Sequence, residues 1–310
     1  MDAQHNRQSN VILITGALGF TGIHACRHFA DLGWRVAALV RKIPASLPSG
    51  LPENMDIYSC DLLDKEKLKR VVKQISPDYV LHLGGKNSVP ESWEHPLLYL
   101  ETNVMSTLYL LDALRPLVHT RVVIVGSRVT LEMRGNYGEI HPYCLSKSLQ
   151  EQAALQWREL FGQHIVIAEP SNLVGPGPST GFCALLAHYM VSCDMADSVS
   201  QPFHISSRVT KRDFLDVRDA VRAYAVLLQK GDPGSIYPVC SGKQSTLETM
   251  AVMMMQQAGR NYTIEYGNQP ENTDHPESPP EALNRLGWEP HVTLRESIKD
   301  VVTYFRMKGV

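Results

Sequence analysis

Tyr143 and Lys147, four residues apart, are the side chains of this 310-residue chain best suited to proton transfer. Their i, i+4 spacing puts both on one face of a helix. A phenol with its ordinary pKa of about 10 is a poor acid or base at neutral pH, but a neighbouring ammonium stabilises the phenolate. Ser127, at the end of an apolar stretch, can hold a substrate oxygen while a hydride moves. An isolated Y-x-x-x-K match is often only an aromatic residue beside a surface lysine, so its context decides.

That context is a glycine-rich turn near the N-terminus. Gly16, Gly19 and Gly22 follow the apolar run 11–14 and lead into a helical pattern over 23–32. The first glycine allows a tight turn, the second lets the backbone approach a pyrophosphate, and the third lets helix pack on strand. The diphosphate would lie at a helix N-terminus, where N–H groups and the helix dipole favour anions. The G-x-x-G-x-x-G spacing is longer than the G-x-G-x-x-G form, and the alternative is a strand-to-helix turn without a ligand.

Strand and helix patterns alternate through the first half of the chain and position these residues. Short apolar runs predict strands, and longer amphipathic patterns predict helices, with Asp64 as a helix N-cap. The predicted strands are 11–14, 34–40, 55–59, 78–83, 121–125 and 164–168, and the predicted helices are 23–32, 64–75, 95–114 and 142–160. Such alternation predicts a parallel sheet with right-handed crossovers, and hence a Rossmann-type doubly wound α/β fold.

The pattern changes beyond Pro170. A Gly/Pro-rich loop is followed by helical patterns near 182–190, 218–229 and 248–258, with irregular segments between them. We expect a dinucleotide-binding domain over 1–169 with a returning segment near 212–240. The segments 170–211 and 241–310 are expected to form a smaller lobe that binds the substrate.

Composition excludes several classes of protein. The hydrophobic content of 44% and charged content of 20% are typical of a globular protein, and a formal net charge of −2 without a basic run argues against nucleic acid as a partner. The six cysteines form no C-x-x-C pair, and no apolar run is long enough to span a membrane, so we expect a cytoplasmic protein. His24 and His28 lie four residues apart, but no third metal ligand is evident, and we expect no metal.

The segments TGALGFTG at 15–22, YCLSK at 143–147 and RDFLDVRD at 212–219, together with Ser127, resemble the extended short-chain dehydrogenase/reductase family. Members of this family act on nucleotide sugars as epimerases, dehydratases and reductases. The segments 125–127, 172–182, 212–224 and 237–244 are most similar to those of the GDP-4-keto-6-deoxy-mannose reductases and their dehydratase relatives. The resemblance spans about residues 11 to 298.

The resemblance implies three sets of site residues. The catalytic set is Ser127, Tyr143 and Lys147. The residues implied to contact the cofactor are Gly16, Gly19, Phe20, Gly22, Asp61, Leu62, Leu83, Gly84, Asn103, Tyr143, Lys147, Pro170, Asn172 and Leu173. Those implied to contact the substrate are Asn172, Arg212 and His275. Arg212 would grip the diphosphate of the sugar nucleotide, and the alternative is a structural ion pair with Asp213.

Charge at the end of the second strand favours NADP as the cofactor. Enzymes that prefer NAD place a carboxylate there to bind the ribose 2′-hydroxyl. This chain has Arg41 and Lys42 at that point and no acid. Two cations suit a 2′-phosphate, so we add Arg41 to the cofactor-binding residues and keep NAD as the alternative. The two side chains would otherwise be solvated loop cations.

Four positions depart from the family pattern. Arg128 and Val129 replace the Asp-Glu pair with which the sugar dehydratases shuttle protons, so elimination of water is disfavoured. Glu169, after the sixth strand, and His275 replace two arginines expected near the nucleotide sugar, which weakens the case for a GDP-mannose derivative. His141 is a candidate substrate contact or a polar loop residue. Glu132 and Glu139 lie in the loop between Ser127 and Tyr143, and either could reach the site.

The residues therefore predict an NADP-dependent reductase of a nucleotide-linked 4-keto-6-deoxy sugar. The first alternative is a nucleotide-sugar 4-epimerase, which oxidises and re-reduces one carbon. The second is a non-catalytic dinucleotide-sensing regulator, which would have no need for the Ser127, Tyr143 and Lys147 set. By analogy with the family, we expect a homodimer through the helices after strands four and five.

Overall fold

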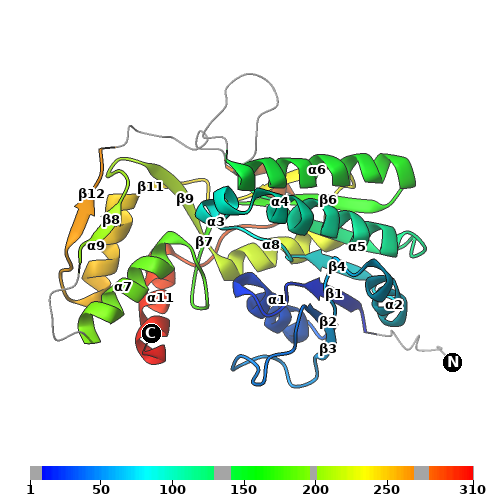
Figure 1. The fold of residues 1–310 in the computed structure, drawn as a ribbon, viewed down its shortest axis with the longest axis horizontal. Helices are drawn as coiled ribbons and strands as arrows, with labels where there is room; N and C mark the ends of the chain where they lie inside the picture. The colour runs from blue at the N-terminus through cyan, green and yellow to red at the C-terminus, as the bar shows by residue number, and fades with distance from the viewer. Residues whose placement is uncertain (1–8, 129–140, 196–200, 269–278, 310) are drawn as a thin grey trace. The chain divides into compact units, whose positions relative to one another are not determined.

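The computed structural model describes residues 9–128, 141–195, 201–268 and 279–309. Its central feature is a seven-stranded sheet with the order β10-β6-β5-β4-β1-β2-β3 (Figure 1). The pairings of β1 with β2 and β4, of β2 with β3, and of β4 with β5 are all parallel. The strands are β1 (Val11–Thr15), β2 (Arg35–Val40), β3 (Asp56–Ser59), β4 (Tyr79–His82), β5 (Arg121–Val125), β6 (His164–Pro170) and β10 (Ile236–Val239). The predicted doubly wound α/β fold is confirmed.

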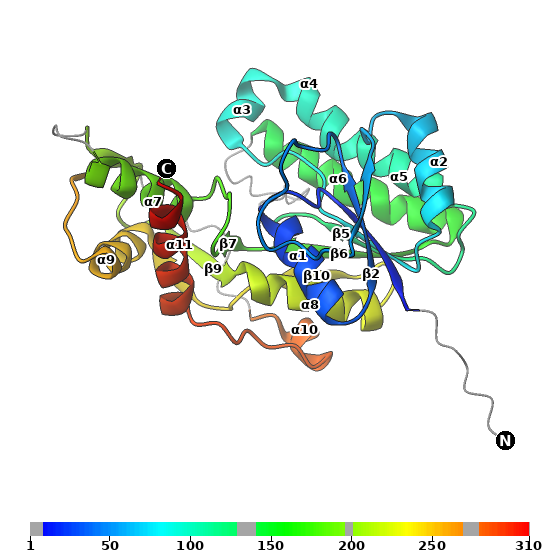
Figure 2. The ribbon, with the colours of Figure 1, turned by 90° about the horizontal axis from the view of Figure 1, so that it is seen from below.

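Two sets of helices cover this sheet (Figure 2). α1 (Phe20–Asp31) packs against β1 and β2. α2 (Lys65–Ile75), α5 (Ser106–Leu114) and α6 (Pro142–Phe161) share one apolar core with alternate residues of the strands, among them Leu13, Val80 and Ile124. The predicted N-cap is confirmed, because the Asp64 carboxylate accepts the N–H of Lys67 at 3.0 Å. The strands, which are buried on both faces, and the amphipathic helices thus produce the layered packing.

The predicted helix over 95–114 is confirmed, because the chain is helical without a break over 96–114, but it is not a regular α-helix throughout. The chain forms α3 (Val89–Glu94), α4 (Pro96–Tyr99), a π-helical segment η1 (Leu100–Met105) and then α5. At this segment the hydroxyls of Ser106 and Thr107 donate to the carbonyls of Thr102 and Asn103. These bonds take carbonyls from the ordinary helical pattern, and a local π turn of this kind is frequent at functional sites. Apolar periodicity does not reveal such a turn.

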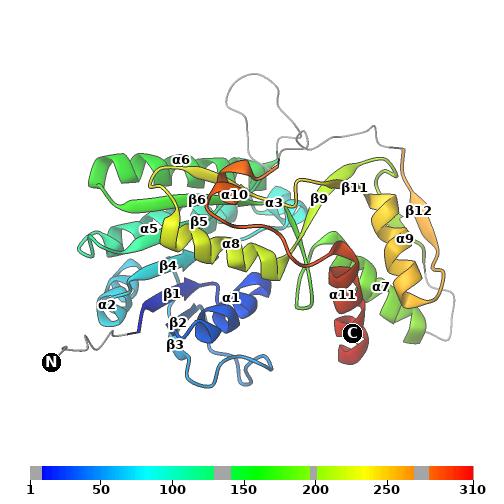
Figure 3. The same ribbon diagram turned by 180° about the vertical axis from the view of Figure 1, so that it is seen from behind.

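The chain divides into two compact units, one of residues 1–126, 140–167 and 227–236 and another of residues 127–139, 168–226 and 237–310. The second unit contains the three-stranded sheet β11-β9-β7 and the pair β12-β8. α7, α9 and α11 pack together in its core (Figure 3). Its strands are β7 (Asn172–Val174), β8 (Phe203–Ile205), β9 (Lys211–Asp216), β11 (Gln244–Thr246) and β12 (Ile264–Tyr266). Its helices are α7 (Phe182–Met195), α8 (Val217–Lys230, which runs into the first unit), α9 (Leu247–Ala258), α10 (Glu281–Arg285) and α11 (Leu294–Lys308).

The expectation of irregular segments in this second unit is wrong where β7, β8, β9, β11, β12, α10 and α11 form. α11 had a readable signal, because Thr293 and Glu296 form a capping box at its start. The domain boundaries predicted from the sequence stay a prediction. Among the described residues, no helix has the length and apolar character that crossing a bilayer requires.

Candidate functional site

The glycine turn has the backbone geometry expected for close approach of a ligand. Gly16 follows β1 with φ of +66°, a conformation that favours glycine. A side chain there would meet the backbone nitrogen of Gly84 at 3.0 Å, and one at Gly22 would meet the Ala17 carbonyl oxygen at 2.6 Å. Gly19 is the N-cap of α1 and supplies no side-chain cap. The first amides of α1 are therefore left for an external acceptor.

The end of β4 lies beside this turn. The N–H of Gly84 donates to the Thr15 hydroxyl at 3.0 Å. A side chain on Gly84 would come within 2.8 Å of Leu62 Cδ1, so Leu62, Gly84 and Gly16 lie together. Leu83, between β4 and Gly84, belongs to the same stretch, and Asp61 accepts the N–H of Leu63 at 3.0 Å. The structure thus brings together the residues predicted to border adenine and those predicted to line the cofactor channel.

Arg41 lies exposed directly after β2, at the same carboxyl edge of the sheet as the glycine turn. Its backbone carbonyl accepts the Ser59 hydroxyl at 3.3 Å, which holds the residue beside β3. Phe20 begins α1, and its ring packs edge-on against His24 at 5.9 Å between centroids. No group of three or more metal-ligating side chains occurs in the described part of the chain.

Tyr143 lies in the first turn of α6. The helix begins after His141, whose Nδ1 accepts the N–H of Cys144 at 3.0 Å. The rings of His141 and Tyr143 stack with centroids 5.8 Å apart and planes 4° apart. The ring of Tyr99 meets the Tyr143 ring edge-on, with the centroids 6.3 Å apart. His141 thus caps α6 and packs on Tyr143, and its role as a substrate contact stays a prediction.

Lys147 lies one helical turn after Tyr143 and is buried. Its ammonium donates to the carbonyl oxygen of Val125 at 2.7 Å and to Oε1 of Gln150 at 2.6 Å. Burial lowers the pKa of Lys147 to about 8, and the charge of Glu151 opposes that shift. The ammonium is thus held at the end of β5, two residues before Ser127 in the chain.

Asn103 lies fully buried in η1 and joins two elements near Tyr143. Its Oδ1 accepts the N–H of Lys86 at 2.8 Å, and its Nδ2 donates to the Lys86 carbonyl at 3.0 Å and to the Ser146 hydroxyl at 2.8 Å. The loop after β4 is thereby fixed to α6. The π turn places the amide inward at this point.

Within the second unit, Ser127 is buried and its neighbour Arg128 is anchored. The Arg128 N–H donates to the Pro170 carbonyl at 3.3 Å, and its Nη1 donates to Cys240 Sγ at 3.7 Å. Glu169 lies inside β6, and the expectation that it follows the sixth strand is wrong because β6 extends to Pro170. Val129, Glu132, Glu139 and His275 lie outside the described residues.

The other predicted contacts of this unit lie on β7 and β9. Asn172 pairs with Phe214 and Leu173 with Leu215, and Asn172 Nδ2 donates to the Asp213 carbonyl at 3.2 Å. The carboxylate of Asp213 accepts four hydrogen bonds, from the Ser171 hydroxyl, the N–H and hydroxyl of Ser241, and the N–H of Lys243. Neighbours on a strand point to opposite faces, so Arg212 is directed away from that carboxylate. Whether Arg212 binds the substrate diphosphate or serves a structural ion pair stays a prediction.

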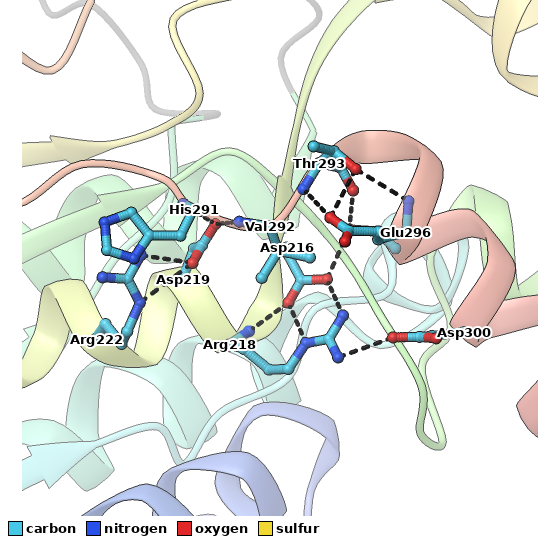
Figure 4. A network of polar contacts seen from close by, with 10 residues as sticks. Asp216, Arg218, Asp219, Arg222, His291, Val292, Thr293, Glu296 and Asp300 are labelled. Atoms are coloured by element: carbon cyan, nitrogen blue, oxygen red, sulfur yellow. Dashed lines mark hydrogen bonds and ion pairs between the residues drawn. The ribbon is translucent and has the colours of Figure 1, made fainter.

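Sequence reasoning missed two buried carboxylates inside RDFLDVRD (Figure 4). Asp216 accepts the backbone N–H and two guanidinium N–H groups of Arg218, and also the Ser297 hydroxyl at 2.6 Å. Asp219 accepts from Arg222 and from the N–H groups of His291 and Val292. They bind the segment before α11, and α11 itself, to the start of α8. An acid pair at a strand-to-helix junction was the available signal, but burial could not be read from it.

Comparison with known proteins gives the family. Residues 12–240 match the model described as the NAD dependent epimerase/dehydratase family. The chain is 26% identical to the GDP-6-deoxy-D-mannose reductase of Pseudomonas aeruginosa, covering 94% of this chain and 96% of that protein. It is 26% identical to the GDP-mannose 4,6-dehydratase sdnI of Sordaria araneosa, covering 93% and 60%.

Two solved structures share the fold. The Thermus thermophilus UDP-glucose 4-epimerase in complex with NAD superposes with a TM-score of 0.81 at 24% identity, covering 96% of this chain and 99% of that one. RMD from Pseudomonas aeruginosa complexed with NADPH superposes with a TM-score of 0.79 at 24% identity, covering 97% and 100%. With the family match, these findings confirm the resemblance read from the motifs. The chain belongs to the NAD-dependent epimerase/dehydratase family, the extended short-chain dehydrogenases/reductases, and is an enzyme of that family.

Proposed function

We propose that this chain is an NADP-dependent reductase of a nucleotide-linked 4-keto-6-deoxy sugar. The observation that carries the proposal is the placement of Lys147, whose buried ammonium lies one turn from Tyr143 and bonds the Val125 carbonyl at the strand end that leads into Ser127. A proton donor and a cation held together in the first unit, with the Ser127 hydroxyl two residues after Val125 in the chain, suit reduction of a carbonyl.

The first unit fits a dinucleotide. The positive φ of Gly16, its close approach to Gly84 and the uncapped start of α1 fit a diphosphate. Arg41, exposed at the end of β2, fits a 2′-phosphate. Relatives are described with both cofactors, since RMD was solved with NADPH and the Thermus epimerase with NAD. NADPH, when bound, supplies the hydride.

In this proposal Ser127, Tyr143 and Lys147 orient and protonate the ketone oxygen of the substrate. Ser127 donates a hydrogen bond to the ketone oxygen and orients it. Tyr143 donates its phenolic proton to the same oxygen as the carbon gains the hydride, so that hydride and proton together convert the ketone to an alcohol. Lys147 stabilises the phenolate left behind and binds the nicotinamide ribose.

Arg128, the residue after Ser127, disfavours a dehydration reaction. Elimination of water needs one group to remove a proton and another to deliver one. A guanidinium is a poor proton shuttle, and that of Arg128 lies against Cys240 Sγ. Arg128 supplies neither function. This favours the activity of the Pseudomonas relative over that of the Sordaria relative.

A nucleotide-sugar 4-epimerase is the second candidate, favoured by the fold shared with the Thermus enzyme. Ser127, Tyr143 and Lys147 would serve it equally, because both reactions move a hydride at one ring carbon. An epimerase keeps its cofactor and consumes none. The homodimer expected from the sequence stays a prediction.

The deciding experiment is a two-step assay. Nucleotide diphosphate sugars are first screened for an increase in melting temperature with NADP present, because a ligand that binds only the folded state must raise it. The 4-keto-6-deoxy forms of the stabilising sugars are then tested for stoichiometric NADPH oxidation. Net oxidation supports the reductase. If the cofactor co-purifies with the protein and the sugars are interconverted without loss of NADPH, the reductase proposal is wrong and the protein is a 4-epimerase.

A further inference from the structure

We propose that Gln150 is a positioning residue for Lys147, and that its amide, oriented by Thr107 and His82, holds the ammonium against the Val125 carbonyl and keeps it charged. The importance of this for turnover rests on the proposed function, but the contacts themselves do not. Gln150 lies in α6 three residues after Lys147 and is 1% exposed.

The two acceptors of the ammonium differ in kind. The Val125 carbonyl belongs to the backbone of β5 and cannot be removed by mutation, whereas Gln150 Oε1, at 2.6 Å, is a side-chain atom. Together they accept two of the three N–H groups of the ammonium. A buried cation needs such acceptors, because burial alone favours the neutral amine. Of the two acceptors, Gln150 is therefore the one that a mutation can remove.

The orientation of the Gln150 amide follows from Thr107. Gln150 Nε2 donates to Thr107 Oγ1 at 2.8 Å, and the Thr107 hydroxyl donates its single proton to the Asn103 carbonyl at 2.7 Å. Because that proton is committed, Oγ1 can only accept from the amide. Turning the amide over would point NH2 groups at an ammonium, so the carbonyl end faces Lys147.

His82 completes the arrangement in one tautomer. Its Nε2 lies 2.8 Å from Thr107 Oγ1, which can only accept, so Nε2 carries the proton. Its Nδ1 then accepts the Thr15 hydroxyl at 2.7 Å, and Thr15 Oγ1 accepts the Gly84 N–H at 3.0 Å. The hydrogen bonds that run from Gln150 through Thr107, His82 and Thr15 to the backbone of Gly84 thus have one consistent assignment of donors and acceptors.

The titratable groups around Lys147 are His82 on β4 and Tyr143 and Glu151 on α6. Burial and the nearby ammonium lower the pKa of His82 to about 3, so it is neutral near neutral pH and the tautomer holds. Glu151 acts on Lys147 through its charge. Gln150 supplies the neutral acceptor between them. Loss of that acceptor removes one of the two hydrogen bonds described for the ammonium and leaves the Val125 carbonyl and the charge of Glu151.

The test is an NMR titration of the Lys147 side chain in full-length protein with isotope-labelled lysine, the signal being assigned with Lys147→Met. We expect Gln150→Leu to lower the titration midpoint by about one to two pH units, the worth of a hydrogen bond to a charged group. Gln150→Glu should raise it, because a carboxylate favours the ammonium more than an amide does. General loosening of the fold would not move the Lys147 midpoint down in Gln150→Leu and up in Gln150→Glu.

The matched control is Gln163→Leu. Gln163 is also buried in the first unit and donates to the Leu111 carbonyl, but it has no contact with Lys147. In Gln163→Leu the titration midpoint of Lys147 should match that of the wild-type protein. An unchanged midpoint in Gln150→Leu, or an equal shift in both leucine variants, overturns the proposal. If Gln150→Leu does not fold, a missing upward shift in Gln150→Glu overturns it.

The titration needs neither substrate nor cofactor, so it separates this inference from the proposed reduction. Where turnover is found, the alkaline limb of kcat should move in the same direction as the midpoint in each Gln150 variant. A fall in kcat without a moved limb would assign Gln150 a merely structural role and contradict the inference.

Discussion

The ammonium of Lys147 lies 2.7 Å from the carbonyl oxygen of Val125, the last residue of β5. This hydrogen bond ties the first half of α6, which carries Tyr143, to the strand end that leads into Ser127. A lysine fixed to the backbone on a buried helix face loses little further entropy when it binds a ligand. The pair therefore provides a preorganised cation where the proposed chemistry needs one.

Tyr143→Phe tests the proton donor. The change keeps the ring and its packing on His141 and Tyr99 and removes only the hydroxyl. We expect kcat for ketone reduction to fall at least about 100-fold, a typical contribution of general acid catalysis. The melting temperature should stay close to that of wild type. Turnover at the wild-type rate would remove Tyr143 from the mechanism.

Arg41→Ala tests the cofactor choice. If the exposed guanidinium binds the 2′-phosphate, its loss should weaken NADPH binding about tenfold, as expected for one charge-assisted hydrogen bond, and leave NADH binding unchanged. Titration calorimetry measures both. Arg35→Ala is the matched control, because Arg35 is a cation at the other end of β2 and pairs with Asp56. Equal effects of the two variants on NADPH would show that only overall charge matters.

His141→Ala tests the cap of α6. Losing the acceptor of the Cys144 N–H should lower the free energy of unfolding by about 1 kcal/mol, measured by urea denaturation. His141→Asn keeps a side-chain acceptor at the cap and should recover most of that loss. If both variants lose the same stability, the imidazole contributes through its stacking on Tyr143 and not through the cap.

His82 predicts a pH dependence of stability. Its pKa is about 3 in the folded protein and near 6.5 when unfolded, so the unfolded chain binds more protons between these values. Above pH ~6.5, protonation of His82 does not reduce the free energy of unfolding. Below that pH it does, and the reduction reaches about 2 kcal/mol at pH ~5.

His82→Asn should flatten that decline between pH ~7 and ~5 by a similar amount, whatever its stability at neutral pH. His204→Asn is the control, because His204 on β8 is largely exposed. Urea denaturation at several pH values gives both slopes. Parallel curves for wild type and His82→Asn would contradict the assignment.

Asp216→Asn tests the buried network of the second unit. Asp216 is 2% exposed and accepts hydrogen bonds from Arg218 and Ser297. The carboxylate is buried but its guanidinium partner is partly exposed, so loss of these charge-assisted hydrogen bonds should cost about 2 kcal/mol. Asp300→Asn removes another partner of Arg218 at 2.8 Å but from a partly exposed position, and should cost less than about 1 kcal/mol. Chemical denaturation that finds equal losses would show that burial does not control this pair.

The sequence by itself determined the layers of the fold and the family. Continuous apolar runs in the strands and amphipathic patterns in the helices are local features of the sequence, so β1 to β6, α1, α2 and α6 formed close to their predicted bounds. The glycines and Tyr143 with Lys147 were readable for the same reason, because each motif spans only a few residues. The short strands β7, β8 and β12 lacked such a pattern and formed by pairing with distant partners.

Only the tertiary structure decided what surrounds those motifs. Gln150, Thr107, His82 and Thr15 come from α6, α5, β4 and β1, and nothing in their spacing indicates that they share hydrogen bonds. The same holds for Asp216, whose Ser297 partner is 81 residues away. A buried polar side chain is stable only when distant chain segments supply its partners, and those segments meet only once the sheet and its helices have packed.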